Sequence, residues 1–258
     1  MAFERSTSIS FSSLDAGLPW YGAEFITSGG YAFSLIACRA LFPVDGYTAS
    51  HFAQLYAGAA KDVAVLAPAV LLGLMTWLFA MSAASRCPSL GHPLVAIGLW
   101  VNRQLSFRRL LLAISVQLLG AIAGAIFARA FFAENLVLHD PSLMSYPSTF
   151  QMGQAVLFEM AMGFFVLWTL FSLASFRPAT RQWQSALSTG LVIGLVAMVL
   201  SLGGRTLTGG IANPAMAMGM VAATHVPIDL VVYVVAPVLG AVTAGLVAGG
   251  PRLVIDRS

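Results

Sequence analysis

The sequence predicts an all-α membrane protein with six transmembrane helices, two re-entrant half-helices and an inverted internal repeat. Hydrophobic residues make up 59% of the 258 residues and charged residues only 9%, which is too little polar side chain to cover a soluble globule. Six apolar runs each come near the ~20 residues that cross a bilayer. A short motif that contains proline and glycine occurs once in each half of the chain.

The six predicted spans divide into two groups of three. They cover residues 23–42, 63–84, 110–133, 153–176, 186–204 and 229–249. We treat residues 1–258 as one transmembrane domain, with repeat one at about 20–133, a loop at about 134–150 and repeat two at about 151–249. The first 20 residues are Ser-rich and lack an early apolar core, so we expect the first span, and not a cleavable signal peptide, to direct insertion.

A short helix is predicted to begin inside the stretch TGGIANPAMAMG, residues 208–219. Asn213 is a good N-cap, and Pro214 suits the first helical position. The helix predicted from there to about residue 224 is too short to cross a bilayer. Broken backbone at membrane depth must be covered by protein or line a water-filled cavity, and a helix N-terminus there directs its positive end into that cavity. We therefore expect a pore-lining half-helix.

The first half of the chain contains the same pattern as GHPLVAIG, residues 91–98. Pro93 corresponds to Pro214, and His92 stands where the second copy has Asn213. Each half then contains three spans and one half-helix, and an odd number of spans inverts the second copy relative to the first.

The distribution of basic residues predicts that both termini are cytoplasmic. Four of the 13 Lys and Arg residues lie on the outer side or near the outer ends of spans: Arg39, Lys61, Arg129 and Arg205. The other nine lie on the side of the N-terminus, which is the expected positive-inside bias: Arg5, Arg86, Arg103, Arg108, Arg109, Arg177, Arg181, Arg252 and Arg257.

The same composition argues against several other classes of protein. The arginines stand singly and are not clustered with aromatic residues, so we expect no nucleic-acid partner. Cys38 and Cys87 match no metal or redox spacing, and we expect them to behave as small apolar residues. We expect no enzymatic activity, no catalytic residue, no cofactor and no metal site.

The duplicated motif, its glycine spacing, GLW at residues 98–100 and QLLGAIAGA at residues 117–125 resemble the aquaporin, or major intrinsic protein, family. The resemblance covers about residues 20–249. It implies a homotetramer in membrane lipid, in which each subunit holds a narrow pore for water or small neutral solutes such as glycerol. The pore motif residues that it implies are His92, Pro93, Leu94, Asn213, Pro214 and Ala215.

Glu24 and Glu159 stand alone in the first and fourth spans, where a charge is costly unless it is satisfied. By resemblance they are buried structural carboxylates that accept hydrogen bonds from backbone amides of the re-entrant loops. A proton-relay or substrate-site role is the alternative that two isolated carboxylates leave open.

His92 departs from the family pattern, which has an asparagine at this position. Histidine is a poor N-cap and can become charged at mildly acid pH. One interpretation is that a neutral imidazole donates one N–H to the solute, and two positive helix ends favour the neutral ring. The other interpretation is a pH-sensitive or blocking role.

The outer selectivity filter of the family corresponds, by motif spacing, to Leu72, Ser201, Gly210 and Met216. Met216 stands where the family usually has an arginine, and none of the four is charged or aromatic. We therefore expect a wider and less polar filter. Two alternatives stay open: Met216 fills a pore that no longer conducts, and Arg205 in the preceding loop either moves its charge toward the mouth or is simply solvated.

These observations predict a passive membrane channel for water and small neutral solutes. The alternative is a non-conducting or weakly conducting structural subunit of a larger membrane assembly, which the departures at His92 and Met216 favour. Asn213, both prolines and both glutamates favour the channel. A secondary transporter is a third possibility, but two matched half-helices with almost no other intramembrane charge argue against coupling to an ion.

Overall fold

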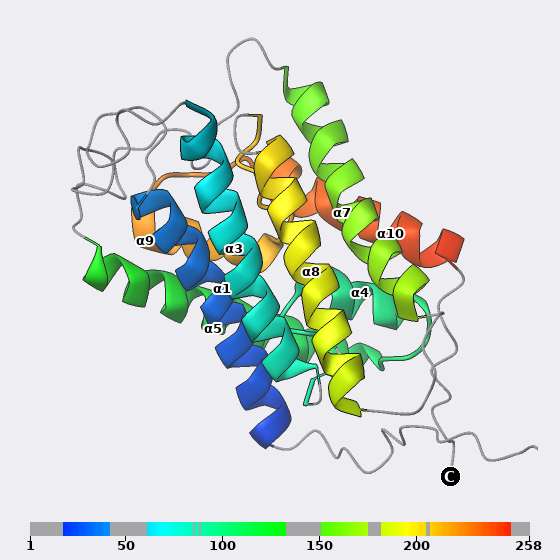
Figure 1. The fold of residues 1–258 in the computed structure, drawn as a ribbon. Helices are drawn as coiled ribbons and strands as arrows, with labels where there is room; N and C mark the ends of the chain where they lie inside the picture. The colour runs from blue at the N-terminus through cyan, green and yellow to red at the C-terminus, as the bar shows by residue number, and fades with distance from the viewer. Residues whose placement is uncertain are drawn as a thin grey trace, which may run out of the picture.

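Within the part of the chain that the computed structural model describes, every regular element is a helix (Figure 1). The described residues are 18–41, 61–84, 86–87, 89–132, 151–174, 182–204 and 207–248. The predicted loop at 134–150, Arg205 and both chain ends lie outside these residues. The predicted all-α membrane fold is confirmed.

The helices follow the same order in both halves of the chain: two long helices, one half-helix and one long helix. The first half contains α1 (Leu18–Leu41), α3 (Lys61–Ala83), α4 (Pro93–Val101) and α5 (Phe107–Phe131). The second half contains α7 (Met152–Ala174), α8 (Gln182–Gly204), α9 (Pro214–Thr224) and α10 (Ala236–Ala248), and a π-helical segment, η3 (Val231–Val235), leads into α10.

Five of the described helices are long and apolar enough to cross a membrane: α3, α5, α7, α8 and η3 with α10. Helix α1 has 24 residues, which is also enough to cross at about 1.5 Å per residue. It is less apolar than the others because it carries polar side chains, among them Glu24 and Arg39, and both of these are buried inside the protein. It also begins at Leu18, earlier than the predicted residue 23. With α1 included, six long helices occupy the places of the six predicted spans.

Close helix pairs form where glycine leaves room for a neighbouring backbone. Gly120 of α5 packs against the backbone of α1 at Phe25, and Gly240 of α10 packs against the backbone of α7 at Met160. The pairs α1–α5 and α7–α10 therefore pack in the same way in the two halves, with a glycine of one helix against the backbone of the other. Small residues at such positions let membrane helices approach closely, where van der Waals packing replaces the missing hydrophobic driving force.

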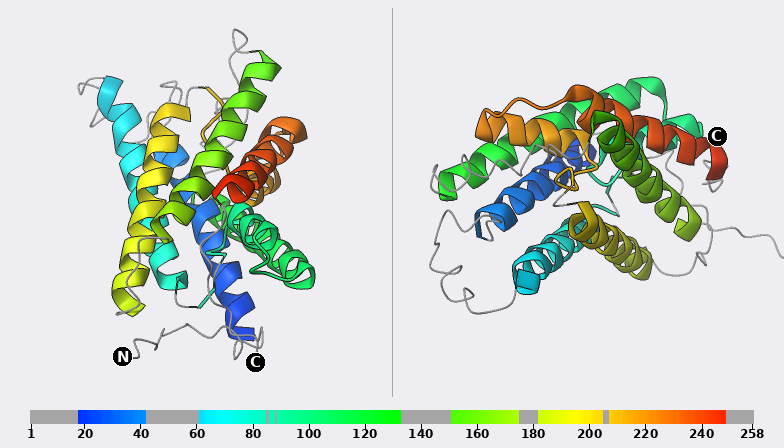
Figure 2. Two further views of the ribbon diagram at one scale, coloured as in Figure 1. Left: turned by 90° about the vertical axis from the view of Figure 1, so that its right-hand side faces the viewer. Right: turned by 90° about the horizontal axis from the view of Figure 1, so that it is seen from above.

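The two half-helices lie on opposite sides of the middle of the molecule (Figures 1 and 2). Helix α4 packs against α5, α7 and α10, while α9 packs against α1 and α5, and the two half-helices also contact each other. Each begins at a proline that follows an extended residue, His92 before α4 and Asn213 before α9. The fold thus brings these two residues together inside the ring of long helices.

Candidate pore site

Asn213 caps α9 and also directs a polar group away from the helix. Its backbone is extended, with φ −144° and ψ 103°, and its Oδ1 accepts hydrogen bonds from Ala215 N at 3.0 Å and Met216 N at 3.2 Å. With Oδ1 turned to the helix, the amide Nδ2 points the other way. This Nδ2 is buried, and it has no hydrogen-bond partner among the described residues.

His92 occupies the corresponding place before α4 but does not cap it. Its backbone is extended, with φ −126° and ψ 116°, and its side chain makes no capping hydrogen bond. The residue is 9% exposed, and its Nδ1 is also buried with no partner in the described part of the chain. Two polar side chains therefore sit at two helix N-termini, each with a nitrogen that a small polar molecule can satisfy.

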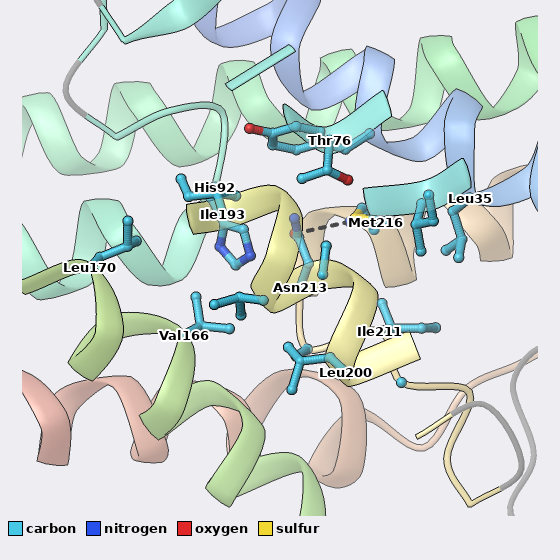
Figure 3. Close-up of a pocket in the computed structure, with 16 residues that line it drawn as sticks. Leu35, Thr76, His92, Val166, Leu170, Ile193, Leu200, Ile211, Asn213 and Met216 are labelled. Atoms are coloured by element: carbon cyan, nitrogen blue, oxygen red, sulfur yellow. Dashed lines mark hydrogen bonds between the residues drawn. The ribbon is translucent and has the colours of Figure 1, made fainter. Parts of the chain in front are cut away.

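Both residues line one cavity of about 590 Å³, its open mouth included. Figure 3 shows the His92 ring and the Asn213 amide in the middle of this cavity, with Met216 and Leu35 toward one end and Leu170 toward the opposite end. We call the Met216 end the outer end. The remaining walls come from α1, α3, α7 and α8 and from the loop residues Gly210, Ile211 and Ala212, and their side chains are mostly aliphatic, so few side-chain atoms can form hydrogen bonds with a molecule inside.

The predicted filter residues are only partly brought together. Leu72, Gly210 and Met216 line the cavity, whereas Ser201 is buried but does not belong to its wall. Helix α8 instead presents Ile193, Ala197 and Leu200 to the cavity. These three follow the i, i+4, i+7 spacing of one helix face, and Ser201 lies about 100° further round the helix than Leu200.

The other predicted motif residues lie behind the cavity wall. Pro93, Leu94, Pro214 and Ala215 are all buried in the first turns of the two half-helices, and none of them lines the cavity. They pack the N-terminal turns of α4 and α9 in place and so support the two residues that do line it.

Glu24 is fully buried and accepts several hydrogen bonds from the loop that precedes α4. Its Oε2 accepts from Gly91 N at 2.8 Å and from Gln117 Nε2 at 2.7 Å, and its Oε1 accepts from the Ser89 hydroxyl. Gly91 directly precedes His92, so this carboxylate fixes the backbone that presents the imidazole.

Glu159 has the matching position in the second half. It is fully buried, its Oε1 accepts from Thr208 Oγ1 at 2.6 Å, and its Oε2 accepts from Ala212 N at 3.2 Å. Ala212 directly precedes Asn213. A re-entrant loop cannot pair all of its backbone amides within itself. Each of the two carboxylates therefore accepts a hydrogen bond from the backbone N–H just before a cavity residue.

Sequence reasoning missed several residues that build the site. Tyr31 and Thr76 line the cavity, and Thr76 follows Leu72 by one helical turn, a spacing that would have identified it. The Tyr31 hydroxyl donates to Leu90 O at 2.9 Å, and the Tyr233 hydroxyl donates to Thr208 O at 2.9 Å. These tyrosines tie the long helices to the loops before α4 and α9, and no local pattern in the sequence identifies such distant partners.

Comparison with known proteins gives a consistent result. A family model described as Major intrinsic protein matches residues 18–248. Aquaporin PIP2-1 of Arabidopsis thaliana is 27% identical over 157 residues, which are 61% of this chain and 55% of that protein. Probable aquaporin PIP1-5 of the same plant is 28% identical over 174 residues, which are 66% of this chain and 61% of that protein. These matches span less than two thirds of the relatives' length.

A solved structure shares the fold. The X-ray structure of the aquaglyceroporin from Plasmodium falciparum matches with a TM-score of 0.72, covering 90% of this chain and 95% of that chain. The sequence identity is 17%, so the likeness is one of architecture.

Proposed function

The chain belongs to the major intrinsic protein family and is an integral multi-pass membrane protein, and from this premise we propose that it is a passive channel for water and small neutral solutes. The observation that carries the proposal is the single cavity that holds His92 Nδ1 and Asn213 Nδ2, both buried and both without a partner among the described residues. Buried polar groups are normally hydrogen-bonded, so a passing solute supplies the partner.

The charge arrangement of the cavity favours neutral solutes. The positive ends of α4 and α9 both point at its middle, where they oppose a cation and orient a dipole. The aliphatic walls would not replace the hydration shell of an ion, so dehydration is costly for charged species. A neutral solute that carries hydroxyl groups on a small apolar body suits walls of this kind.

The outer end of the cavity supports passage of a solute somewhat larger than water. Leu35 and Met216 make that end apolar (Figure 3), and Leu72 and Gly210, which also line the cavity, add no charge to its wall. The flexible thioether of Met216 can move to let a solute pass. Glycerol therefore serves as the test solute beside water.

Stopped-flow light scattering on proteoliposomes tests the proposal, first with a water gradient and then with a glycerol gradient. Ile193→Trp fills the cavity from α8, because Ile193 lines it and is 7% exposed. Val199→Trp on the same helix is the matched control, since Val199 is 59% exposed on the outer surface. We expect flux above that of protein-free liposomes for the unmodified protein and the control, and loss of that flux for Ile193→Trp.

Liposomes that carry neither solute with correctly folded protein would refute the channel and favour a structural subunit of a larger membrane assembly. If Ile193→Trp keeps the same flux as the control Val199→Trp and the unmodified protein, the solute path does not run through this cavity. The same gradients applied with and without sodium or a pH difference test the passive mechanism, because a coupled transporter responds to the ion gradient.

We further propose a homotetramer whose subunits each have both termini in the cytoplasm. The excess of basic residues on the side of the N-terminus supports this orientation. Exposed apolar side chains such as Leu74 of α3 and Leu195 of α8 lie on the outside of the helix bundle. They give it a surface suited to lipid or to a second copy of the chain. Accessibility of a tag at each terminus in intact and opened cells tests the orientation.

A further inference from the structure

Arg39 is a buried arginine that donates a hydrogen bond to the opposite half of the chain. It occupies the last turn of α1 and is 5% exposed. Its Nη2 donates a hydrogen bond to Gly209 O at 2.5 Å, across 170 positions of sequence. An ionisable side chain held inside a membrane protein is costly and marks a candidate functional site.

The position of Arg39 relative to the cavity follows from the helix that carries it. Tyr31 and Leu35, one turn apart on α1, both line the cavity, and Arg39 follows at the next turn of the same face. Leu35 lies toward the outer end of the cavity (Figure 3). Gly209, which accepts the hydrogen bond, directly precedes Gly210 of the cavity wall. Helix and loop thus place the guanidinium just beyond the outer end.

We propose that Arg39 is the charge-selective residue of this pore, which keeps protons and other cations out at its outer mouth. The proposal deepens the proposed channel function and rests on it. A fixed positive charge beside a pore mouth repels cations and leaves neutral solutes unaffected, and the repulsion is stronger where protein and lipid replace water. Met216 of α9 brings no charge to the outer end of the cavity. The positive charge at this end therefore comes from Arg39 of α1.

A structural role has to be separated from this electrostatic one, because the hydrogen bond to Gly209 also positions the loop. Arg129 provides the comparison: it lies in the last turn of α5 and its Nη1 donates to Ala223 O at 2.7 Å. There the guanidinium donates to the Ala223 carbonyl at the C-terminal end of α9, a place where a cation stabilises a helix. Both arginines therefore hold repeat two, but only Arg39 stands beside the cavity.

The experiment measures proton leak and glycerol flux in the same proteoliposomes, with an internal pH dye and an imposed potassium diffusion potential. We expect Arg39→Gln to raise the proton leak by about tenfold or more, on the scale of one unit charge near the mouth, while glycerol flux stays within about twofold. Arg39→Lys keeps the charge, so its proton leak should stay as low as that of the unmodified protein. Arg129→Gln, the matched control, should stay tight as well.

A second variant tests the charge within a single folded protein. Arg39→His is charged in acid and neutral in base, so its leak at a constant pH difference should rise as the pH is raised across the titration of the imidazole. A contact that only holds the loop would not follow this titration.

Three results would overturn the proposal and leave the channel function standing. Arg39→Gln liposomes that carry glycerol and remain tight to protons would reduce Arg39 to an anchor of the loop, and so would an Arg39→Lys variant that leaks as much as Arg39→Gln. An Arg39→His variant whose proton leak does not change across the pH range would show that the charge does not control the leak. Unmodified protein that carries no solute would instead refute the channel function itself, and the proposal with it.

Discussion

Gly73 of α3 and Gly194 of α8 pack backbone to backbone, although they lie in different halves of the chain. A Cβ on Gly73 would lie 2.8 Å from Gly194 O, and a Cβ on Gly194 would lie 2.6 Å from Gly73 O. The two glycines occupy equivalent places in the two repeats, so the contact is the same when viewed from either half. The long helices α3 and α8, both of which line the cavity, are joined at this point.

Gly194→Ala is therefore expected to destabilise the protein by roughly 1–3 kcal/mol, because the added methyl group forces the two helices apart. Gly203→Ala on the same helix is the control, since a Cβ there meets nothing within 4 Å. Alanine is the better helix former, so the control should be neutral or more stable by about 0.5–1 kcal/mol. Thermal unfolding in detergent measures both. Equal melting temperatures for the two variants would contradict the close contact.

Glu24 and Glu159 are expected to act as stability residues. Replacing Glu24 by Leu would leave buried donors at Ser89, Gly91 and Gln117 without their acceptor, at a cost of roughly 2–5 kcal/mol. Glu24→Gln keeps one acceptor oxygen and should cost less. Expression yield and thermal stability should fall in the order unmodified, Gln, Leu.

The same series in Glu159 separates this role from a proton relay. Loss of solute flux in Glu159→Gln at undiminished stability would favour the relay or substrate-site interpretation, because the Gln variant keeps the shape and removes the charge. Leu variants that are as stable as the unmodified protein would remove the structural role altogether.

His92→Asn is expected to stabilise the start of α4. His92 makes no capping hydrogen bond, whereas Asn213 at the matching place accepts two. An asparagine in the same extended backbone would cap α4 and add about 0.5–2 kcal/mol of stability. The melting temperature should rise, and solute flux should persist because the new amide also offers a donor to the cavity.

The same variant tests acid sensitivity. Protonation of the His92 ring would add a charge beside two positive helix ends, so flux through the unmodified protein should fall in acid, well below about pH 6. His92→Asn should not respond. If both proteins lose flux in the same way on acidification, the response belongs to another group.

The sequence predicts those parts of the fold that have a local cause. Long apolar runs give the long helices, Asn213 with the proline after it predicts the start of α9, and the matching Pro93 predicts the start of α4. The boundary of α1 is predicted less well, because its first turn carries Trp20 and Tyr21, aromatic residues that lie ahead of the apolar run. Polar residues such as Thr27 and Ser28 also lower its hydropathy, yet both are buried in the structure.

The cavity wall is harder to predict from sequence. Helix α8 is apolar on the side that faces lipid and on the side that faces the cavity, so no periodic contrast indicates that Leu200 lines the wall and Ser201 does not. The contact between Arg39 and Gly209 joins residues in different repeats. A charge at the end of a span is typical of a solvated end, and only the packed structure shows that this one is buried.

Met216 is the position at which solute choice can be changed most directly. Its side chain lines the outer end of the cavity near Leu35 (Figure 3), and its backbone N–H is already held by Asn213 Oδ1, so a new side chain need not disturb the start of α9. We expect Met216→Arg to narrow this end and to lower glycerol flux more than water flux, because the larger solute needs the space that the thioether can vacate.

Met216→Ala is the opposite test at the same position. Removing the thioether widens the outer end, so glycerol flux should rise relative to water flux. Stopped-flow traces for the three proteins, compared at equal incorporation, measure the ratio of the two fluxes. Unmodified liposomes that carry water but exclude glycerol would contradict the wide outer end. A ratio that stays constant across Ala, Met and Arg would place the narrowest part of the path elsewhere, and the pair His92 and Asn213 at the middle of the cavity would then be the next position to vary.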